Sequence, residues 1–466
     1  MLKIGGQKIP FITVILVISE SLLIGLALFL SAVISLSPLS ITTQSINSET
    51  FIRLILVIVV CEFCLYYYDL YDFQVVGRRA VLFVQLLQAL GVACFLLAFV
   101  YFLQPSLSMG RGVALLAAPA ILAIILSWRL LLDASAPLLR RTEKMLVLGM
   151  GKPGIDLVKE LMVRPEFSTE VVGFLDEHES GANVGQMLES SKIVGKVSDV
   201  TRIAGEAKVD RVIISLAERR GKMPIHELLQ LRFAGVRVED AHTMFERVTG
   251  RILLEYLSPS WLILSEGFRK SGITRFLKRT TDLVISLVAL VIAAPIMLLV
   301  AAAIVVESGR PVLFRQRRVG LEGREFEMLK FRSMYQDSER HGPAWAKDAD
   351  RRVTRVGYYI RRFRLDELPQ MINVLLGDMS IAGPRPEQPY FVQLLEQSIP
   401  YYGLRHTVRP GITGWAQIKF MYGASVEESK TKLEYDLFYI KHLSVFLDLA
   451  IIFETVKVLL SGRGAK

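Results

Sequence analysis

Leu365-Asp366-Glu367-Leu368-Pro369-Gln370 is the stretch that decides how this chain of 466 residues is interpreted. It places two adjacent carboxylates beyond a long apolar segment that Pro295 interrupts. Adjacent carboxylates repel each other, so both stay ionised only where a cation or a metal ion neutralises them. One could then act as a nucleophile and the other as a Mg²⁺ ligand. An isolated Asp-Glu pair is usually a solvated surface feature, so the surrounding sequence decides between these interpretations.

Further motifs surround the acidic pair in a fixed order. They are Lys278-Arg279 with Asp282, Pro311–Gly320, Lys330–Met334, Gly383-Pro384-Arg385-Pro386, Arg409–Gln417 and Tyr435–Leu437. In this order, residues 278–461 closely resemble the bacterial sugar transferase family, the polyprenyl-phosphate phosphoglycosyl transferases. The resemblance is to the large multi-domain membrane type that initiates exopolysaccharide or surface glycan synthesis. It implies transfer of a sugar 1-phosphate from a UDP-sugar to undecaprenyl (polyprenyl) phosphate.

The composition agrees with a membrane protein. Hydrophobic residues make up 52% of the chain, and the mean hydropathy of +0.41 is high for a soluble protein. The net charge of +10 suits loops that face anionic lipid, and it suits phosphate-bearing substrates. Because no helix-turn-helix, zinc-binding or base-stacking pattern occurs, we expect the lipid bilayer as a partner and no nucleic acid. The sequence leaves a homo-oligomer open.

Four apolar segments, at about 11–36, 51–68, 81–103 and 112–133, predict a four-helix transmembrane domain over residues 1–142. Each is long enough, or nearly so, to cross a hydrocarbon core of about 30 Å. Basic residues flank the cytoplasmic ends expected from the positive-inside rule, namely Lys3, Lys8, Arg78, Arg79, Arg140 and Arg141. We therefore expect a multi-pass protein of the bacterial inner (cytoplasmic) membrane with a cytoplasmic catalytic domain. Glu20 and Glu62 lie within spans, and their role is open.

Residues 143–250 alternate between strand and helix patterns and predict an α/β Rossmann-like domain with an open parallel sheet. Gly149, Gly151 and Gly154 follow the first strand, and their spacing suits a phosphate at a helix N-terminus. Asp176 closes the next strand, where it could meet a ribose hydroxyl. A lone glycine pattern of this kind is weak evidence for a cofactor, so a structural or regulatory module is the alternative. Residues 251–277 are expected to form a connector.

The fifth apolar segment, Leu283–Val306, creates a conflict. A straight span would move the acidic pair to the side opposite the cytoplasmic nucleotide sugars. Pro295 breaks helical hydrogen bonding in its middle, so we predict a re-entrant helix over 280–307 that enters and leaves on one face. The resemblance implies the same, although Ala294 stands where many members have serine. The predicted fold is thus a membrane α-helical bundle plus the α/β domain plus an α-rich catalytic domain, residues 278–466, with a re-entrant membrane helix.

The resemblance also implies roles in catalysis. Asp366 is the expected nucleophile, which forms an aspartyl phosphosugar, and Glu367 is the expected ligand of the Mg²⁺ cofactor. The sequence alone does not order the two carboxylates. Lys330 and Arg332 could bind phosphates. The alternative is that both charged side chains belong to a solvent-exposed surface without a ligand. The resemblance implies a nucleotide-binding role for Pro384-Arg385-Pro386, for which a rigid turn is the alternative.

Weaker candidates complete the predicted site. Arg409 is a second phosphate candidate, and Asp436 is a conditional second carboxylate. Trp415 could stack on a base or pack in the core. A polar stretch that contains His341 could be a mobile lid.

Two other functions compete with the sugar transfer. A membrane-bound NAD-dependent nucleotide-sugar epimerase or dehydratase would usually need a Tyr-x-x-x-Lys pair. None of the 15 tyrosines has a lysine four residues later, which counts strongly against that class. A non-catalytic scaffold or sensor would not need the acidic pair together with its phosphate-contact motifs, so it ranks last.

Overall fold

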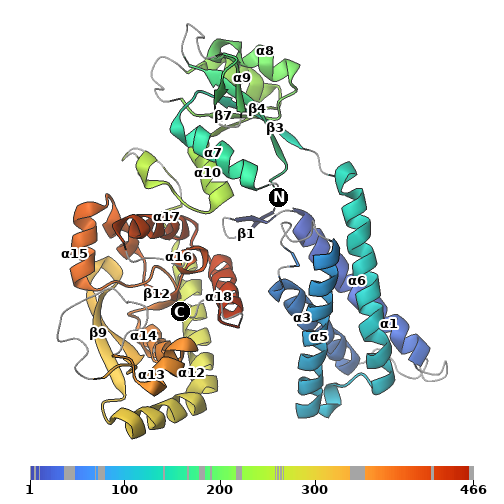
Figure 1. Ribbon diagram of the computed structural model, residues 1–466, viewed down its shortest axis with the longest axis vertical. Coiled ribbons are helices and arrows are strands. Elements are labelled where there is room, and N and C mark those ends of the chain that lie inside the picture. The colour runs from blue at the N-terminus through green and yellow to red at the C-terminus, as the bar shows by residue number, and fades with distance from the viewer. Residues whose placement is uncertain are drawn as a thin grey trace. The chain divides into compact units, whose positions relative to one another are not determined.

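The computed structural model describes the chain in two compact units (Figure 1). It leaves out residues 1, 5–6, 10, 36–47, 69, 72–78, 140–141, 165–166, 178–183, 189–190, 217–222, 258, 260–261, 263–264, 266, 336–351, 421–424 and 461–466. The predicted lid around His341 lies outside the described residues, as do Arg78, Arg140 and Arg141. The first unit comprises Met1–Leu2 and Lys8–Glu239, and the second comprises Lys3–Gln7 and Asp240–Lys466.

Four long apolar helices form the N-terminal bundle and confirm the predicted membrane helices. They are α1 (Phe11–Ser35), α3 (Ser48–Tyr67), α5 (Arg79–Leu103) and α6 (Arg111–Leu139). Each contains a segment long and apolar enough to span a bilayer. Their inward faces bury Ile24, Leu65, Leu86 and Ile125 completely, whereas other large apolar side chains such as Phe102 are exposed. This distribution suits helices whose outer faces meet lipid.

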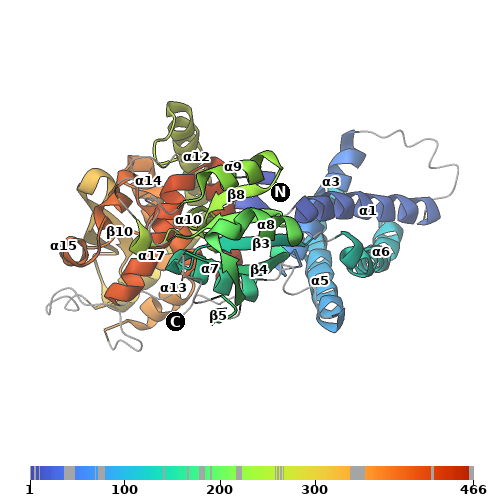
Figure 2. The same ribbon diagram turned by 90° about the horizontal axis from the view of Figure 1, so that it is seen from above.

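The α/β part of the first unit has a six-stranded sheet of order β5-β6-β4-β3-β7-β8. The strands are β3 (Glu143–Leu148), β4 (Thr169–Asp176), β5 (Met187–Leu188), β6 (Ser191–Lys196), β7 (Arg211–Ile214) and β8 (Arg237–Asp240). β3 runs parallel to both β4 and β7, and β4 runs parallel to β6, which confirms the predicted parallel sheet. The helices α8 (Val200–Glu206) and α9 (Ile225–Phe233) lie beside this sheet (Figure 2). Their buried side chains pack on the apolar side chains of the strands. α7 (Lys152–Val163) follows β3.

The part of the second unit that the structure describes is rich in helices, and β9 to β12 form two small sheets in it. Its helices are α10 (Ala241–Thr249), α12 (Gly272–Ser308), α13 (Arg355–Arg362), α14 (Gln370–Leu376), α15 (Pro389–Ser398), α16 (Trp415–Lys419), α17 (Val426–His442) and α18 (Val445–Leu460). β9 (Leu313–Val319) and β10 (Glu325–Phe331) form an antiparallel hairpin. β11 (Ser380–Ala382) and β12 (Gly411–Thr413) pair in parallel. A core of buried apolar residues from α15, α16, α17 and α18 joins these elements.

The helix α12 is continuous from Gly272 to Ser308, but it changes direction sharply along its length (Figure 1). Pro295 lies inside it and removes one helical hydrogen bond. Ile285 in the first half packs on α14 and β11, and Ile304 in the second half packs on β10 and α13. Both halves therefore return to the same unit, which is the helix-break-helix shape expected of a re-entrant helix.

Candidate active site

The acidic pair lies in a short 3-10 turn, η7 (Leu365–Glu367), between α13 and α14. Arg364 precedes the turn in a left-handed backbone conformation with φ 52°, and Pro369 leads into α14. The flanking Leu365 and Leu368 pack on the apolar cluster formed by α12, β10 and α13. These apolar contacts fix the turn and leave both carboxylates half-buried.

Glu367 is held by positive charge. Its Oε1 accepts a hydrogen bond from Arg385 Nη2 at 2.9 Å, and Arg364 Nη1 lies 3.8 Å away. Burial alone would raise the pKa of Glu367, but the charges of Arg385 and Lys330 outweigh it and lower this pKa to about 2. Glu367 is therefore a firmly ionised carboxylate that already carries a cationic partner.

Asp366 has the opposite electrostatic character. Burial raises its pKa above the ordinary value for an aspartate, and the neighbouring Glu367 raises it further. The charge of Lys330 acts against this rise. Environments that separate the pKa values of two neighbouring acids usually give them different chemical tasks. This difference distinguishes the two carboxylates in a way that the sequence alone does not.

Lys330 approaches the acidic pair from β10, where it lies opposite Phe314 of β9. Burial lowers the pKa of its ammonium group to about 8, and the positive charge of Arg385 adds to this effect. Glu367 and Asp366 oppose the shift. Lys330 thus belongs to the same electrostatic cluster as the acidic pair, as expected for a phosphate-contacting residue.

The Pro384-Arg385-Pro386 loop follows β11 and is fixed through its carbonyl groups. The carbonyl of Pro384 accepts from the Gly411 amide at 2.9 Å, and that of Pro386 accepts from Arg318 Nη1 at 2.9 Å. Gly383 precedes the loop, where a Cβ atom would lie only 2.5 Å from the Arg409 carbonyl. This close approach requires glycine and allows the loop to lie against β12.

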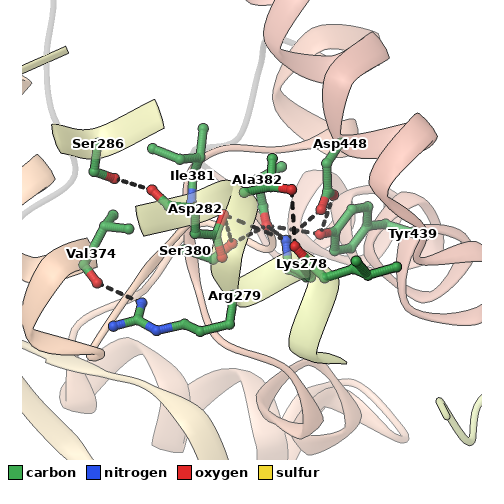
Figure 3. Close-up of polar contacts among 12 residues, drawn as sticks. Lys278, Arg279, Asp282, Ser286, Val374, Ser380, Ile381, Ala382, Tyr439 and Asp448 are labelled. Atoms are coloured by element: carbon green, nitrogen blue, oxygen red, sulfur yellow. Dashed lines mark hydrogen bonds and ion pairs between the residues drawn. The ribbon is translucent and has the colours of Figure 1, made fainter. Parts of the chain in front are cut away.

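A buried polar network ties the start of α12 to this loop (Figure 3). Lys278 Nζ lies 2.6 Å from Asp448 Oδ2 and donates to the Ala382 carbonyl at 3.1 Å. The Tyr439 hydroxyl lies 2.7 Å from Asp448 Oδ1 and 2.8 Å from the same carbonyl. Since Ala382 ends β11, the network fixes the strand that leads directly into the loop.

Two further residues at the start of α12 position the acidic pair and the loop (Figure 3). Asp282 Oδ1 accepts from Ser380 Oγ at 3.0 Å and from the Ile381 amide at 3.1 Å, which holds β11. Arg279 Nη1 donates to the Val374 carbonyl at 2.7 Å at the end of α14. The motif Lys278-Arg279 with Asp282 therefore anchors both segments that carry the predicted catalytic groups.

The family of the chain follows from comparison with known proteins. The model of the family described as bacterial sugar transferase matches residues 273–462. The exopolysaccharide production protein PSS of Rhizobium leguminosarum bv. phaseoli is 41% identical over 195 residues, which cover 40% of this chain and 98% of that relative. The chain belongs to the bacterial sugar transferase family. A second model, described as CoA-binding domain, matches residues 67–237 of this sugar transferase.

Two longer relatives share more of this sugar transferase. A UDP-N-acetylgalactosamine-undecaprenyl-phosphate N-acetylgalactosaminephosphotransferase of Aeromonas hydrophila is 44% identical over 239 residues, covering 51% of this chain and 56% of the relative. A UDP-glucose:undecaprenyl-phosphate glucose-1-phosphate transferase of Escherichia coli (strain K12) is 35% identical over 305 residues, covering 64% of each chain. The sugar transferase thus spans less than two thirds of the length of these relatives.

Sequence reasoning missed Arg405, which lies beneath the Pro384-Arg385-Pro386 loop. Its Nη2 donates to the Arg385 carbonyl at 2.8 Å and lies 3.0 Å from Asp436 Oδ2. Asp436, a predicted substrate contact, is buried against this arginine, and burial raises its pKa to about 6 although Arg405 opposes the rise. No local motif marks Arg405, because its partner Asp436 lies on a distant helix, α17.

Arg332 and Arg409, the other predicted phosphate contacts, stabilise the ends of helices. Arg332 Nη2 donates to the Ser308 carbonyl at 2.8 Å and to the Gly309 carbonyl at 2.6 Å, where α12 ends. A cation at this end also interacts favourably with the helix dipole. Arg409 Nε donates to the Gly377 carbonyl at 2.9 Å, just beyond α14. Contact of either arginine with a substrate stays a prediction.

The residues present fit Mg²⁺ only as part of a site that the substrate completes. Among the described residues, no group of three or more His, Cys, Asp or Glu side chains is arranged to hold a metal ion. Mg²⁺ is commonly bound by one or two carboxylates together with phosphate oxygens and water. The adjacent Asp366 and Glu367 match that donor set, so a metal ion would need the diphosphate of the substrate as its further ligand.

The glycine-rich turn of the sugar transferase packs closely on Ser215, the residue that follows β7. The Gly151 amide donates to the Ser215 carbonyl at 2.7 Å, and the Gly154 amide donates to Ser215 Oγ at 2.8 Å. Pro153 has no amide proton. A Cβ at Gly149 would lie 2.7 Å from the Ser215 carbonyl, so close packing on β7 explains this glycine too. Both amides are therefore engaged by Ser215 in this structure, and contact of the turn with a nucleotide stays a prediction.

Two other predicted residues are buried. Asp176 is only 1% exposed at the end of β4, and its ribose contact stays a prediction. Trp415 is buried in the catalytic core, where it stacks on Phe438 with ring centroids 5.7 Å apart. Its Nε1 donates to the Gly250 carbonyl at 2.8 Å. Of the two roles expected for Trp415, the structure therefore supports core packing.

Proposed function

We propose that this chain transfers a sugar 1-phosphate from a UDP-sugar to undecaprenyl phosphate through a covalent aspartyl intermediate. The observation that carries the proposal is the arrangement of the acidic pair, in which Arg385 Nη2 donates to Glu367 Oε1 at 2.9 Å and the ammonium group of Lys330, from β10, interacts with both carboxylates. The names of the Aeromonas and Escherichia relatives describe this class of reaction. The relative from Rhizobium is named for exopolysaccharide production, which supports a role at the start of exopolysaccharide or surface glycan synthesis.

In the first step, a carboxylate oxygen of Asp366 attacks the phosphorus next to the sugar. The new O–P bond forms as the diphosphate bond breaks, and uridine monophosphate leaves with the bonding electrons. In the second step, a phosphate oxygen of the polyprenyl phosphate attacks the same phosphorus and displaces Asp366. The products are a polyprenyl diphosphate sugar and the free carboxylate. Dividing one displacement into two in this way predicts ping-pong kinetics.

The surrounding cations stabilise the charge that develops during these steps. Lys330 and Arg385 both interact with the acidic pair and would bind the diphosphate oxygens. Glu367, with Asp366 beside it, would hold Mg²⁺, which when bound neutralises phosphate oxygens and favours displacement at phosphorus. The Arg385 guanidinium keeps Glu367 ionised before a substrate arrives.

The bent helix α12 supports a location of the reaction at the membrane surface. A re-entrant helix would seat the acidic pair at the level of the lipid headgroups, where the phosphate of a polyprenyl chain is found. The soluble UDP-sugar would arrive from the aqueous side. We place this site on the cytoplasmic face of the bacterial inner membrane, because the basic loops of the N-terminal bundle favour that orientation.

Trapping the intermediate tests the proposal. The purified full-length protein in lipid nanodiscs is incubated with a UDP-sugar labelled in the sugar, without polyprenyl phosphate. We expect one label per protein and one equivalent of released uridine monophosphate, followed by loss of the label when undecaprenyl phosphate is added. Asp366→Asn should abolish both labelling and transfer, because an amide is a poor nucleophile.

The matched control is Glu396→Gln, which changes an exposed acid on α15 of the same unit and should label like the parent. Substantial turnover by Asp366→Asn would refute the assignment of the nucleophile. Separate reactions with UDP-glucose, UDP-galactose and UDP-N-acetylgalactosamine identify the sugar, since the relatives differ in the sugar that their names contain.

A further inference from the structure

The Pro384-Arg385-Pro386 loop is held by three successive carbonyl groups, each with a different donor. The Gly411 amide binds the first, Arg405 binds the second and Arg318 binds the third, at 2.9, 2.8 and 2.9 Å. The two prolines have no amide proton, so the loop has few other means of attachment. The middle contact acts on Arg385 itself, the residue whose side chain reaches Glu367 at 2.9 Å.

Arg405 is itself held rigidly. It is 6% exposed, it lies 3.0 Å from Asp436 Oδ2, and it donates through Nη1 to the hydroxyl of Tyr402. Asp436 and Tyr402 are each only 2% exposed. A buried arginine with charged and aromatic partners loses little further freedom when it binds a carbonyl, so it can define the position of that carbonyl.

We propose that Arg405, oriented by Asp436, is a positioning residue that fixes the backbone at Arg385 and thereby directs the Arg385 guanidinium toward Glu367. Arg405 acts through the loop and does not touch the substrate. Asp436 then acts through Arg405, which differs from the direct substrate contact expected from the sequence. The inference rests on the proposed function insofar as the Arg385–Glu367 pair serves sugar-phosphate transfer.

The alternative to a positioning role is a purely structural one, in which Arg405 only neutralises the charge of the buried Asp436. Arg405→Met removes both the neutralisation and the carbonyl contact, and it leaves a buried carboxylate unpaired. The double variant Arg405→Met with Asp436→Asn removes the unpaired charge but still lacks the donor to the Arg385 carbonyl. The two roles therefore predict opposite results for the double variant.

We expect Arg405→Met alone to lower the thermal unfolding temperature and the transfer rate. The double variant should unfold near the parental temperature, yet its kcat/KM should stay at least about tenfold below that of the parent, as for a lost hydrogen bond from a charged donor. Amide hydrogen exchange in the segment around Arg385 should become faster in the folded double variant, while exchange in α17 stays parental.

The control replaces another ion pair of the same unit, Arg251 with Glu434, whose Nη1 and Oε2 lie 3.4 Å apart. Arg251→Met with Glu434→Gln should leave transfer and exchange near Arg385 unchanged. Parental kcat/KM or parental exchange around Arg385 in the folded Arg405 and Asp436 double variant would overturn the positioning role. If the parent protein transfers no sugar, the proposed function is refuted. The hydrogen exchange measurement would still test whether Arg405 fixes the backbone at Arg385.

Discussion

Lys330 is a residue beside the acidic pair whose charge responds to ordinary changes of pH. Burial and the neighbouring Arg385 lower its pKa to about 8, so its ammonium group is charged below that value and neutral above it. By contrast, Glu367 has a pKa of about 2 and stays ionised throughout the same range. The positive charge available to a diphosphate therefore falls as the pH rises through about 8.

We expect transfer to decline on the alkaline side with a midpoint near pH 8, because Lys330 loses its proton there. An arginine at position 330 keeps its charge at high pH. In Lys330→Arg the alkaline decline of the transfer rate should therefore occur at a higher pH, even if the maximum rate is lower. Rates of sugar transfer measured from pH 6 to 10 in nanodiscs check this. An unchanged alkaline limb in Lys330→Arg would show that another group sets it.

For contacts between individual residues, the sequence is informative only where the two partners are close along the chain. Asp366 and Glu367 are neighbours, and the family resemblance points to both. The contact between Arg405 and Asp436 joins η8 (Tyr402–Thr407) to α17, and no spacing rule connects those two elements. Likewise, Gly151 and Gly154 look like a phosphate cradle until Ser215 of a distant strand end is seen to occupy their amides.

Among the elements, α12 shows what an apolar pattern predicts well and what it leaves out. The bend at a proline and the contact of both halves with one unit agree with the predicted re-entrant shape. The helix begins at Gly272, before the predicted residue 280, because Ser271 caps it by accepting the Thr274 amide at 3.1 Å. The first turns mix apolar residues with charged ones such as Lys278 and Arg279, so they lie outside the continuous apolar segment although they anchor the helix.

The helices α1 and α6 are joined by a buried ion pair inside the membrane bundle. Arg129 donates to Glu20 through Nε at 2.6 Å and through Nη2 at 2.9 Å, and both side chains are nearly fully buried. Glu62 on α3 instead binds the hydroxyls of Ser21 and Tyr71. The Tyr71 hydroxyl also lies 2.7 Å from Glu20 Oε2, so the two intramembrane acids share this partner, and the ion pair with Arg129 is what distinguishes Glu20.

Glu20→Gln should destabilise the bundle by about 3–5 kcal/mol, because it leaves the Arg129 charge buried without a counter-charge. Glu62→Gln should cost much less, since an amide can still bond both hydroxyls. Thermal unfolding of the two variants in the same nanodiscs compares them directly. Equal losses in the two variants would contradict the assignment of Glu20 as the partner that matters for stability.

For the whole molecule, the order of a membrane bundle, an α/β sheet and a helix-rich catalytic unit follows from hydropathy and from strand-helix alternation. The limits between parts are harder to predict. Apart from Lys3–Gln7, the second compact unit runs from Asp240 and includes α10, whereas residue 250 is the expected end of the α/β domain. That domain boundary stays a prediction. Glu246 of α10 binds Lys441 at 2.8 Å and His442 at 2.6 Å, and such pairs leave no periodic trace in the sequence.

The orientation of the whole chain has a direct test. In a background in which Cys94 is replaced by serine, Glu396→Cys places a thiol on the exposed surface of α15. A membrane-impermeant maleimide should label it in inverted vesicles and not in intact cells, since we place the catalytic unit in the cytoplasm. Asn47→Cys, in the loop predicted to face outward, is the matched control and should label in intact cells. Labelling of Glu396→Cys in intact cells would contradict the proposed cytoplasmic site.

The anchoring of α12 has a mechanical consequence. The first turns of α12, which precede the apolar segment predicted to enter the lipid, hold β11 through Lys278 and Asp282 and hold the end of α14 through Arg279. Any vertical shift of this helix, such as one imposed by a thicker or thinner bilayer, would pull on both supports at once. A change in membrane thickness would then alter the distance between the Arg385 guanidinium and the Glu367 carboxylate at the reaction centre.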